Sequence, residues 1–139
     1  MARPVVVDTG PIVALVRSDD QFHAWVLRVI AGLSPPLLTC EAVVAEAWFL
    51  LGRTHGGREA LAGLLDHELV RVAFRFDDER KRVVELMRKY ADVPMSPADA
   101  CLVRMCELSD GYAVLTLDSD FAVYRKLRDQ AVPVIAPTG

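Results

Sequence analysis

The chain has 139 residues, of which 53% are hydrophobic and 25% are charged, so we expect one compact domain spanning residues 1–139. No stretch is of low complexity or carries charges of only one sign, which excludes a disordered protein and a charged nucleic-acid-binding tail. The net charge of -3 argues against a broadly basic surface, although bound divalent cations would add positive charge where a phosphate lies.

The first half of the chain predicts two strands and three helices. Its opening run of β-branched residues is typical of a strand buried in a parallel sheet, and it ends at Asp8. A later segment is almost uniformly apolar and predicts a buried helix that ends before Gly52. In chain order these elements are a strand at 4–7, a helix beginning at 12–16, a helix at 22–33, a strand at 37–39 and a helix at 42–51.

The second half continues the alternation of helices and strands. Ser96-Pro97-Ala98-Asp99 has the form of a capping box that opens a helix. The predicted elements are a helix at 58–66, a strand at 69–74, helices at 77–90 and 96–108, and strands at 113–116 and 132–135. Strands that alternate with helices predict an α/β fold, with a mostly parallel sheet, right-handed crossovers and helices on both faces.

Two aspartates follow predicted strand ends, where parallel α/β sheets bind their ligands. Asp8 follows the first strand, and Asp118 follows the strand at 113–116. Each aspartate also has an ordinary structural alternative: Asp8 as a helix cap, and Asp118 with Asp120 as turn residues. Asp99 has an equally ordinary alternative as the acidic member of the capping box.

Glu46 is the most informative carboxylate, because it is the only charged side chain between Ala42 and Leu51. An ionised carboxylate inside a buried helix would be expensive, so we favour a site role over solvent exposure or pairing with an arginine. Together the four acids supply oxygen ligands that suit Mg²⁺ or Mn²⁺. Their mutual repulsion would make such a cluster unfavourable without a cation.

Other catalytic chemistries are not supported. An aspartate-nucleophile phosphatase has a second aspartate two residues after the first, and Gly10 occupies that position here. The histidines and cysteines form no Ser–His–Asp or Cys–His motif. Three cysteines inside apolar segments lack the paired spacing of a zinc site, so we interpret Cys40, Cys101 and Cys106 as buried, reduced thiols.

The apolar run near the N-terminus is too short for a signal peptide or a membrane span. We therefore expect no membrane association and a cytoplasmic location.

Four blocks of the sequence resemble the PIN-domain ribonucleases: Val5-Val6-Val7-Asp8-Thr9-Gly10-Pro11, Val44-Ala45-Glu46, Ser96-Pro97-Ala98-Asp99-Ala100 and Thr116-Leu117-Asp118-Ser119-Asp120-Phe121. The match spans essentially the whole chain, whose length is similar to that of a VapC-type toxin of a bacterial or archaeal toxin–antitoxin pair. The resemblance implies a three-layer α/β/α sandwich. It also implies that the metal-binding, catalytic acids are Asp8, Glu46, Asp99 and Asp118, with Asp120 as a fifth acid at the metal and Thr116 as a supporting hydroxyl.

The resemblance further implies an Mg²⁺-dependent endoribonuclease, with Mn²⁺ as a substitute, that hydrolyses RNA with a metal-activated water. It implies a homodimer and a cognate antitoxin protein whose tail covers the active site. A metal-dependent nuclease directed at DNA and a catalytically idle PIN-fold binding module remain alternatives.

Two further groups of residues have open interpretations. The turn after the Glu46 helix carries basic side chains that contact the RNA backbone or belong to a solvated loop, namely Arg53, His55 and Arg58. Three aromatic residues form either part of the core or an apolar groove for an antitoxin or a second subunit, namely Trp25, Trp48 and Phe49.

Overall fold

The structure is a computed structural model that describes residues 3–138, and its centre is a parallel sheet. The strands are β1 (Val5–Val7), β2 (Leu37–Thr39), β3 (Val70–Val72), β4 (Ala113–Leu115) and β7 (Val134–Ile135). They lie in the order β3-β2-β1-β4-β7, and every pairing between them is parallel. A separate antiparallel hairpin consists of β5 (Arg125–Lys126) and β6 (Gln130–Ala131).

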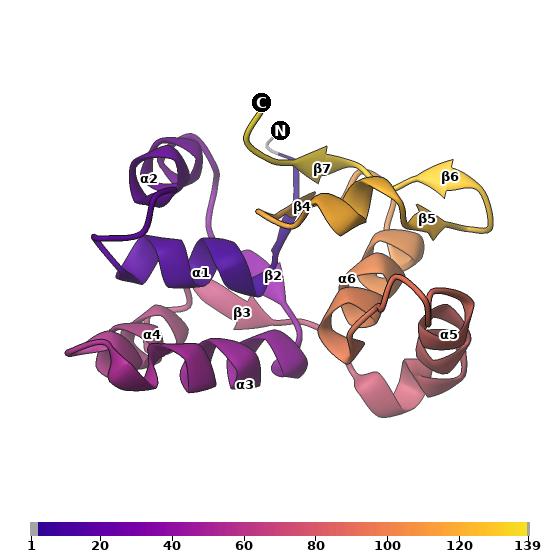
Figure 1. Cartoon of the computed structure of the whole chain (residues 1–139), viewed down its shortest axis with the longest axis horizontal. Helices are drawn as coiled ribbons and strands as arrows, with labels where there is room; N and C mark the ends of the chain where they lie inside the picture. The colour runs from indigo at the N-terminus through magenta and orange to yellow at the C-terminus, as the bar shows by residue number, and fades with distance from the viewer. Residues whose placement is uncertain (1–2, 139) are drawn as a thin grey trace.

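Helices cover the sheet on both sides. They are α1 (Thr9–Val16), α2 (His23–Ala31), α3 (Glu41–Leu50), α4 (Gly57–Asp66), α5 (Phe76–Lys89) and α6 (Pro97–Leu108), with short 3-10 turns η1 (Leu51–Arg53) and η2 (Ser119–Ala122). Figure 1 shows α1 to α4 on one side of the strands and α5 and α6 on the other. The predicted α/β/α arrangement is therefore confirmed.

The order of the strands creates a crevice between β1 and β4. From β1 the chain moves outward to β2 and β3, and it then returns to pair β4 on the opposite side of β1. Val7 and Leu115 are partners in the parallel register, so both strands end at the same level. Ligands of open α/β sheets bind where the strand order reverses in this way, beyond the carboxyl ends of the strands.

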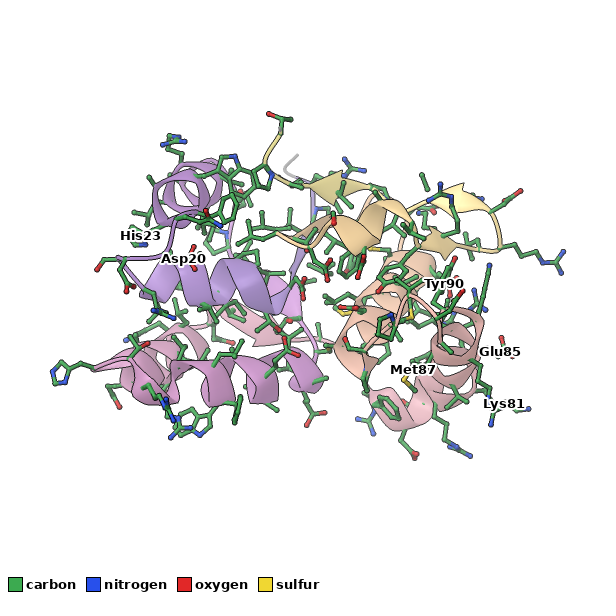
Figure 2. All side chains as sticks on the ribbon, viewed as in Figure 1. Asp20, His23, Lys81, Glu85, Met87 and Tyr90 are labelled. Carbon is green, nitrogen blue, oxygen red and sulfur yellow. The ribbon has the colours of Figure 1, made fainter. Side chains whose placement is uncertain are left out.

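Ion pairs hold α6 against α5 on the far side of the sheet. Arg82 Nη2 lies 2.7 Å from Glu107 Oε2, and Arg104 Nε lies 2.8 Å from Glu79 Oε1. At the end of α5, the hydroxyl of Tyr90 accepts a hydrogen bond from the Arg125 N–H at 2.9 Å, which ties the hairpin to this helix pair (Figure 2). Because α6 carries Asp99, these contacts also position one of the predicted site residues.

The prediction of a buried helix at 42–51 was wrong. In α3 only Val43 and Ala47 are buried, and the exposed fractions of Trp48, Phe49 and Leu50 are 48%, 76% and 47%. The physical reason is that α3 packs on α1, α6 and α4, but these contacts leave the side chains of Trp48, Phe49 and Leu50 largely uncovered within residues 3–138. Trp25, by contrast, is half-buried against the core.

Smaller differences concern element ends. The first helix begins at Thr9 rather than Ile12, because Asp8 caps it. The predicted strands at 69–74 and 132–135 are shorter in the structure, and the β5–β6 hairpin was not predicted because its strands are too short and polar for a periodic pattern.

The three cysteines are buried and free, as expected. Within residues 3–138 no helix combines the length and hydropathy needed to cross a membrane.

Candidate active site

Asp8 is fixed at the point where β1 ends and α1 begins. Its backbone N–H donates to the carbonyl of Leu115 at 3.0 Å, which extends the ladder between β1 and β4 to this residue. Its Oδ1 accepts a hydrogen bond from the Thr9 N–H at 2.8 Å, and its Oδ2 accepts one from the Thr116 hydroxyl at 2.8 Å. The helix cap considered from the sequence is therefore present, and it holds this carboxylate beside the end of β4.

Thr116 connects Asp8 to the loop that carries the next two acids. The Asp118 N–H donates to Thr116 Oγ1 at 2.9 Å, so this hydroxyl both donates and accepts. Asp118 Oδ1 in turn accepts from the Asp120 N–H at 2.9 Å and opens η2. Asp118 therefore does act as a turn residue, as considered from the sequence. The same turn places its carboxylate over the crevice between β1 and β4.

Asp99 occupies the first turn of α6, in the capping box predicted from the sequence. Its N–H donates to Ser96 Oγ at 3.0 Å, and its Oδ2 accepts from the Ser96 N–H at 3.4 Å. The same Oδ2 accepts a hydrogen bond from the Tyr124 hydroxyl at 2.9 Å. Asp99 Oδ1 makes no hydrogen bond within the described part of the chain, so it is free for a ligand.

A cleft of about 450 Å³ lies over the carboxyl ends of β1 and β4. Its lining includes every acid predicted for the site: Asp8, Glu46, Asp99, Asp118 and Asp120. We call this feature the acid cleft. Residues separated by more than a hundred positions therefore meet at one place, as expected for the reversal point of the sheet.

Glu46 reaches the acid cleft for a different reason from the one inferred above. Because α3 is not a buried helix, Glu46 is an exposed residue rather than a carboxylate inside an apolar interior. The desolvation argument for Glu46 was therefore wrong. The residue still lines the cleft, because α3 packs beside α1 and presents this side chain toward the end of β1.

Burial and mutual repulsion perturb the acids. The pKa of Asp8 is raised to about 6, chiefly because burial penalises the charged form, and the charges of Asp99 and Asp118 add to this effect. The hydrogen bonds from Thr116 and Thr9 partly oppose the increase. Burial also raises the pKa of Asp99, against the hydrogen bond from Tyr124. The acids are therefore close enough to disfavour one another's ionisation.

The chemistry of these residues fits a divalent cation. The donors are carboxylates, and the buried hydroxyl of Thr9, another cleft residue, has no hydrogen-bond partner within residues 3–138. Oxygen donors of this kind suit Mg²⁺ and Mn²⁺. In the described residues no three His, Cys, Asp or Glu side chains stand grouped closely enough to hold an ion. Protein donors engage the carboxylates of Asp8, Asp99 and Asp118. Each engaged carboxylate still keeps unused lone pairs.

Sequence reasoning missed Tyr124. This residue is completely buried, packs edge-on against Phe121 and Tyr90, and donates its hydroxyl to Asp99. Burial and the charge of Asp99 raise the pKa of Tyr124, so the hydroxyl stays protonated and acts as a donor. The available signal was an aromatic residue one turn beyond Phe121, but nothing in the sequence indicates that it reaches α6.

Comparisons with known proteins agree with this geometry. A family model described as PIN domain matches residues 5–127. Among solved structures, the crystal structure of Mycobacterium tuberculosis VapC20, described as a sarcin-ricin loop cleaving toxin, superposes with a TM-score of 0.76 at 25% sequence identity. That match covers 86% of this chain and 93% of the VapC20 chain. No match was found among curated protein sequences.

Proposed function

The chain belongs to the PIN domain family, and from this we propose that it is a metal-dependent endoribonuclease, the toxin of a type II toxin–antitoxin pair. The observation that carries the proposal is the convergence of Asp8, Asp99 and Asp118, together with Glu46, on one cleft at the reversal point of the sheet. The similarity to a VapC toxin supports RNA as the substrate class.

The acids would hold the ion, with Asp8, Glu46, Asp99 and Asp118 as the principal ligands and Asp120 as a fifth. A bound Mg²⁺, or Mn²⁺ in its place, would lower the pKa of a water molecule and offset charge at the scissile phosphate.

The remaining side chains of the site have positioning roles. Thr116 holds Asp8 and the Asp118 backbone in fixed relation, and Tyr124 holds Asp99 through a protonated hydroxyl. Both positioning residues are buried, so their hydrogen bonds are protected from competition by water. These hydrogen bonds fix the carboxylates of Asp8 and Asp99 and the backbone of Asp118 at the cleft before any ion binds, against the mutual repulsion of the acids.

The proposed function also concerns the assembly of the protein, its antitoxin and its location in the cell. We propose that residues 1–139 form one nuclease domain, that the protein forms a homodimer, and that an antitoxin protein covers the acid cleft. Trp48, whose exposed fraction on α3 is 48%, supports an apolar contact with the antitoxin or a second subunit. Because cellular RNA is the substrate, we place the protein in the cytoplasm.

The test uses purified protein without an antitoxin, incubated with a structured RNA and with DNA of the same sequence. We expect cleavage of the RNA in Mg²⁺ or Mn²⁺, leaving 5′-phosphate and 3′-hydroxyl ends, and no cleavage in chelator. Preferred cleavage of DNA would support the alternative nuclease. Absence of any cleavage by folded protein with bound metal would support an idle binding module.

The toxin role has its own test. Expression of the chain without a partner should arrest growth, and Asp8→Asn, expressed to the same soluble level, should relieve the arrest. Normal growth with soluble wild-type protein would contradict the toxin role and leave the nuclease activity standing.

A further inference from the structure

A second pocket adjoins the acid cleft and has the opposite charge. It has a volume of about 680 Å³, and Leu50, at the end of α3, lines both pockets. Three arginines line it from separate elements: Arg17 after α1, Arg53 in η1 and Arg58 in α4. We call it the arginine pocket. The pocket is locally positive, although the net charge of the whole chain is negative.

The charge of the arginine pocket is largely uncompensated. Within residues 3–138 no aspartate or glutamate lines it. Asp19 pairs with Arg17 at 3.2 Å, but the exposed fraction of that aspartate side chain is 73%, so the pair lies in solvent and is weak. Arg53 makes no side-chain hydrogen bond or ion pair in the described part of the chain. At least two guanidinium groups are therefore available to an anion.

Arg58 is held in place before any ligand binds. Its Nε donates to the Trp48 carbonyl at 2.9 Å, and its guanidinium lies 5.0 Å from the centre of the Trp48 ring. A Cβ at position 52 would approach Arg58 Nη2 to 2.6 Å, so glycine at this position makes room for the guanidinium. The hydrogen bond uses only Nε, and within residues 3–138 the two Nη groups of Arg58 have no hydrogen-bond acceptor.

Phe49 adds an aromatic face to the arginine pocket. Its exposed fraction of 76% is unusual for a phenylalanine, and it lies on the last turn of α3, one residue before Leu50. Sites for single-stranded nucleic acid combine backbone-binding cations with exposed aromatic side chains on which bases stack. Of the three basic residues considered as RNA contacts in the turn after α3, Arg53 and Arg58 line the pocket and His55 does not.

We propose that the arginine pocket binds a phosphate of the RNA strand next to the scissile one, with Phe49 stacking a neighbouring base. This inference rests on the proposed function. Guanidinium groups match phosphate geometry in a bidentate manner, and the acid cleft by itself repels a polyanion. An acidic peptide would also be attracted by charge, but it offers no base for Phe49 and no reason for continuity with a hydrolytic cleft.

The test measures RNA binding rather than cleavage, by fluorescence anisotropy of a labelled single-stranded RNA in chelator over a range of salt concentrations. Each phosphate contact to a single strand contributes about -0.7 to the slope of log K against log salt. We expect Arg53→Gln to weaken binding about fivefold and to reduce the magnitude of the slope by about 0.7. The matched control is Arg88→Gln, which removes the same charge from an exposed position on α5.

A second variant tests the pocket without altering charge. Gly52→Ala should displace the Arg58 guanidinium and weaken RNA binding, while thermal melting confirms that the variant is folded. If Arg53→Gln and Arg88→Gln have the same affinity and slope, the proposal is overturned. It is also overturned if Arg53→Gln weakens binding of a polyglutamate peptide but not of RNA. The binding assay does not depend on catalysis. Failure of the nuclease proposal would therefore appear as absent cleavage, whereas failure of the arginine-pocket proposal would appear as equal RNA binding by Arg53→Gln and Arg88→Gln.

Discussion

The hydroxyl of Thr116 donates to Asp8 Oδ2 at 2.8 Å and accepts from the Asp118 N–H at 2.9 Å, so one buried side chain fixes two of the acids. Asp8 begins α1, and Asp118 opens η2, on the loop after β4. The contact exists because β1 and β4 are neighbours in parallel register and end at the same level. The geometry of the acid cleft therefore depends on this threonine as directly as on the carboxylates.

Thr116→Val keeps the shape of the side chain but removes both hydrogen bonds. We expect it to lower the free energy of unfolding by about 1–3 kcal/mol, because it leaves buried polar groups without partners. RNA cleavage should fall more than tenfold, since Asp8 and Asp118 lose their common support. Thr116→Ser keeps the hydroxyl and should retain most activity and stability. Similar cleavage rates in the valine and serine variants would show that the hydroxyl does not position the acids.

Asp8 makes the stability of the metal-free protein depend on pH. Its folded pKa of about 6 exceeds the ordinary value of 3.8, so the folded state binds this proton more tightly than the unfolded state. Stability should therefore fall as pH rises, by about 2 kcal/mol between pH 4 and pH 7 in chelator. Asp8→Asn removes this dependence and still caps α1, so it should melt higher than wild type at pH 7.5 in chelator.

The same melts in Mg²⁺ show whether Asp8 is a ligand. A cation that binds only the folded state stabilises according to its affinity, so wild type should gain more than Asp8→Asn across a Mg²⁺ titration. Equal gains would mean that Asp8 does not contact the ion.

Asp118 and Asp120 should differ in importance. The Asp118 carboxylate accepts a hydrogen bond from the Asp120 N–H at the start of η2, whereas the Asp120 carboxylate lines the cleft without a hydrogen bond within residues 3–138. We expect Asp118→Asn to abolish RNA cleavage and Asp120→Ala to reduce it about tenfold or less. Equal residual activity in the two variants, measured on the same RNA, would show that their roles are assigned wrongly.

Tyr124→Phe tests the support of Asp99 while keeping the aromatic packing with Phe121 and Tyr90. The lost hydrogen bond lowers the pKa of Asp99 in the wild type, so that pKa should rise in the variant. We therefore expect a higher Mg²⁺ concentration for half-maximal cleavage, with the largest difference at acidic pH. A Mg²⁺ dependence identical to wild type from pH 6 to pH 8 would exclude a positioning role for Tyr124.

The sequence was sufficient to predict the sheet and the residues at strand ends. Asp8 and Asp118 follow runs of buried β-branched or aliphatic residues, and the capping box at Ser96 and Asp99 is a local signal that needs no tertiary context. These predictions succeeded because short-range patterns determine them. The location of Asp8 and Asp118 at one edge of the sheet also followed, since parallel strands end at the same edge, but the pairing of β1 with β4 came from the structure.

Features that depend on long-range packing could not be predicted in this way. An apolar helix has the same sequence whether both of its faces are covered or only one, so the exposure of Phe49 and Glu46 on α3 was missed. Tyr124 contacts α6 from a turn after η2, and no periodic pattern links those segments. Arg53 and Arg58 were considered as RNA contacts from the sequence, but their pocket with Arg17 was missed for the same reason, because Arg17 is far from them in sequence.

We propose above that the acid cleft binds a divalent ion and that RNA cleavage requires this ion. The most direct measurement is Mn²⁺ binding by electron paramagnetic resonance, with cleavage of labelled RNA followed in the same samples, for wild type, Asp8→Asn and Asp118→Asn. We predict that both variants bind Mn²⁺ at least about tenfold more weakly, and that cleavage follows occupancy of the ion and stops in chelator. Cleavage that persists in chelator, or variants that lose activity while binding Mn²⁺ like wild type, would contradict the claim.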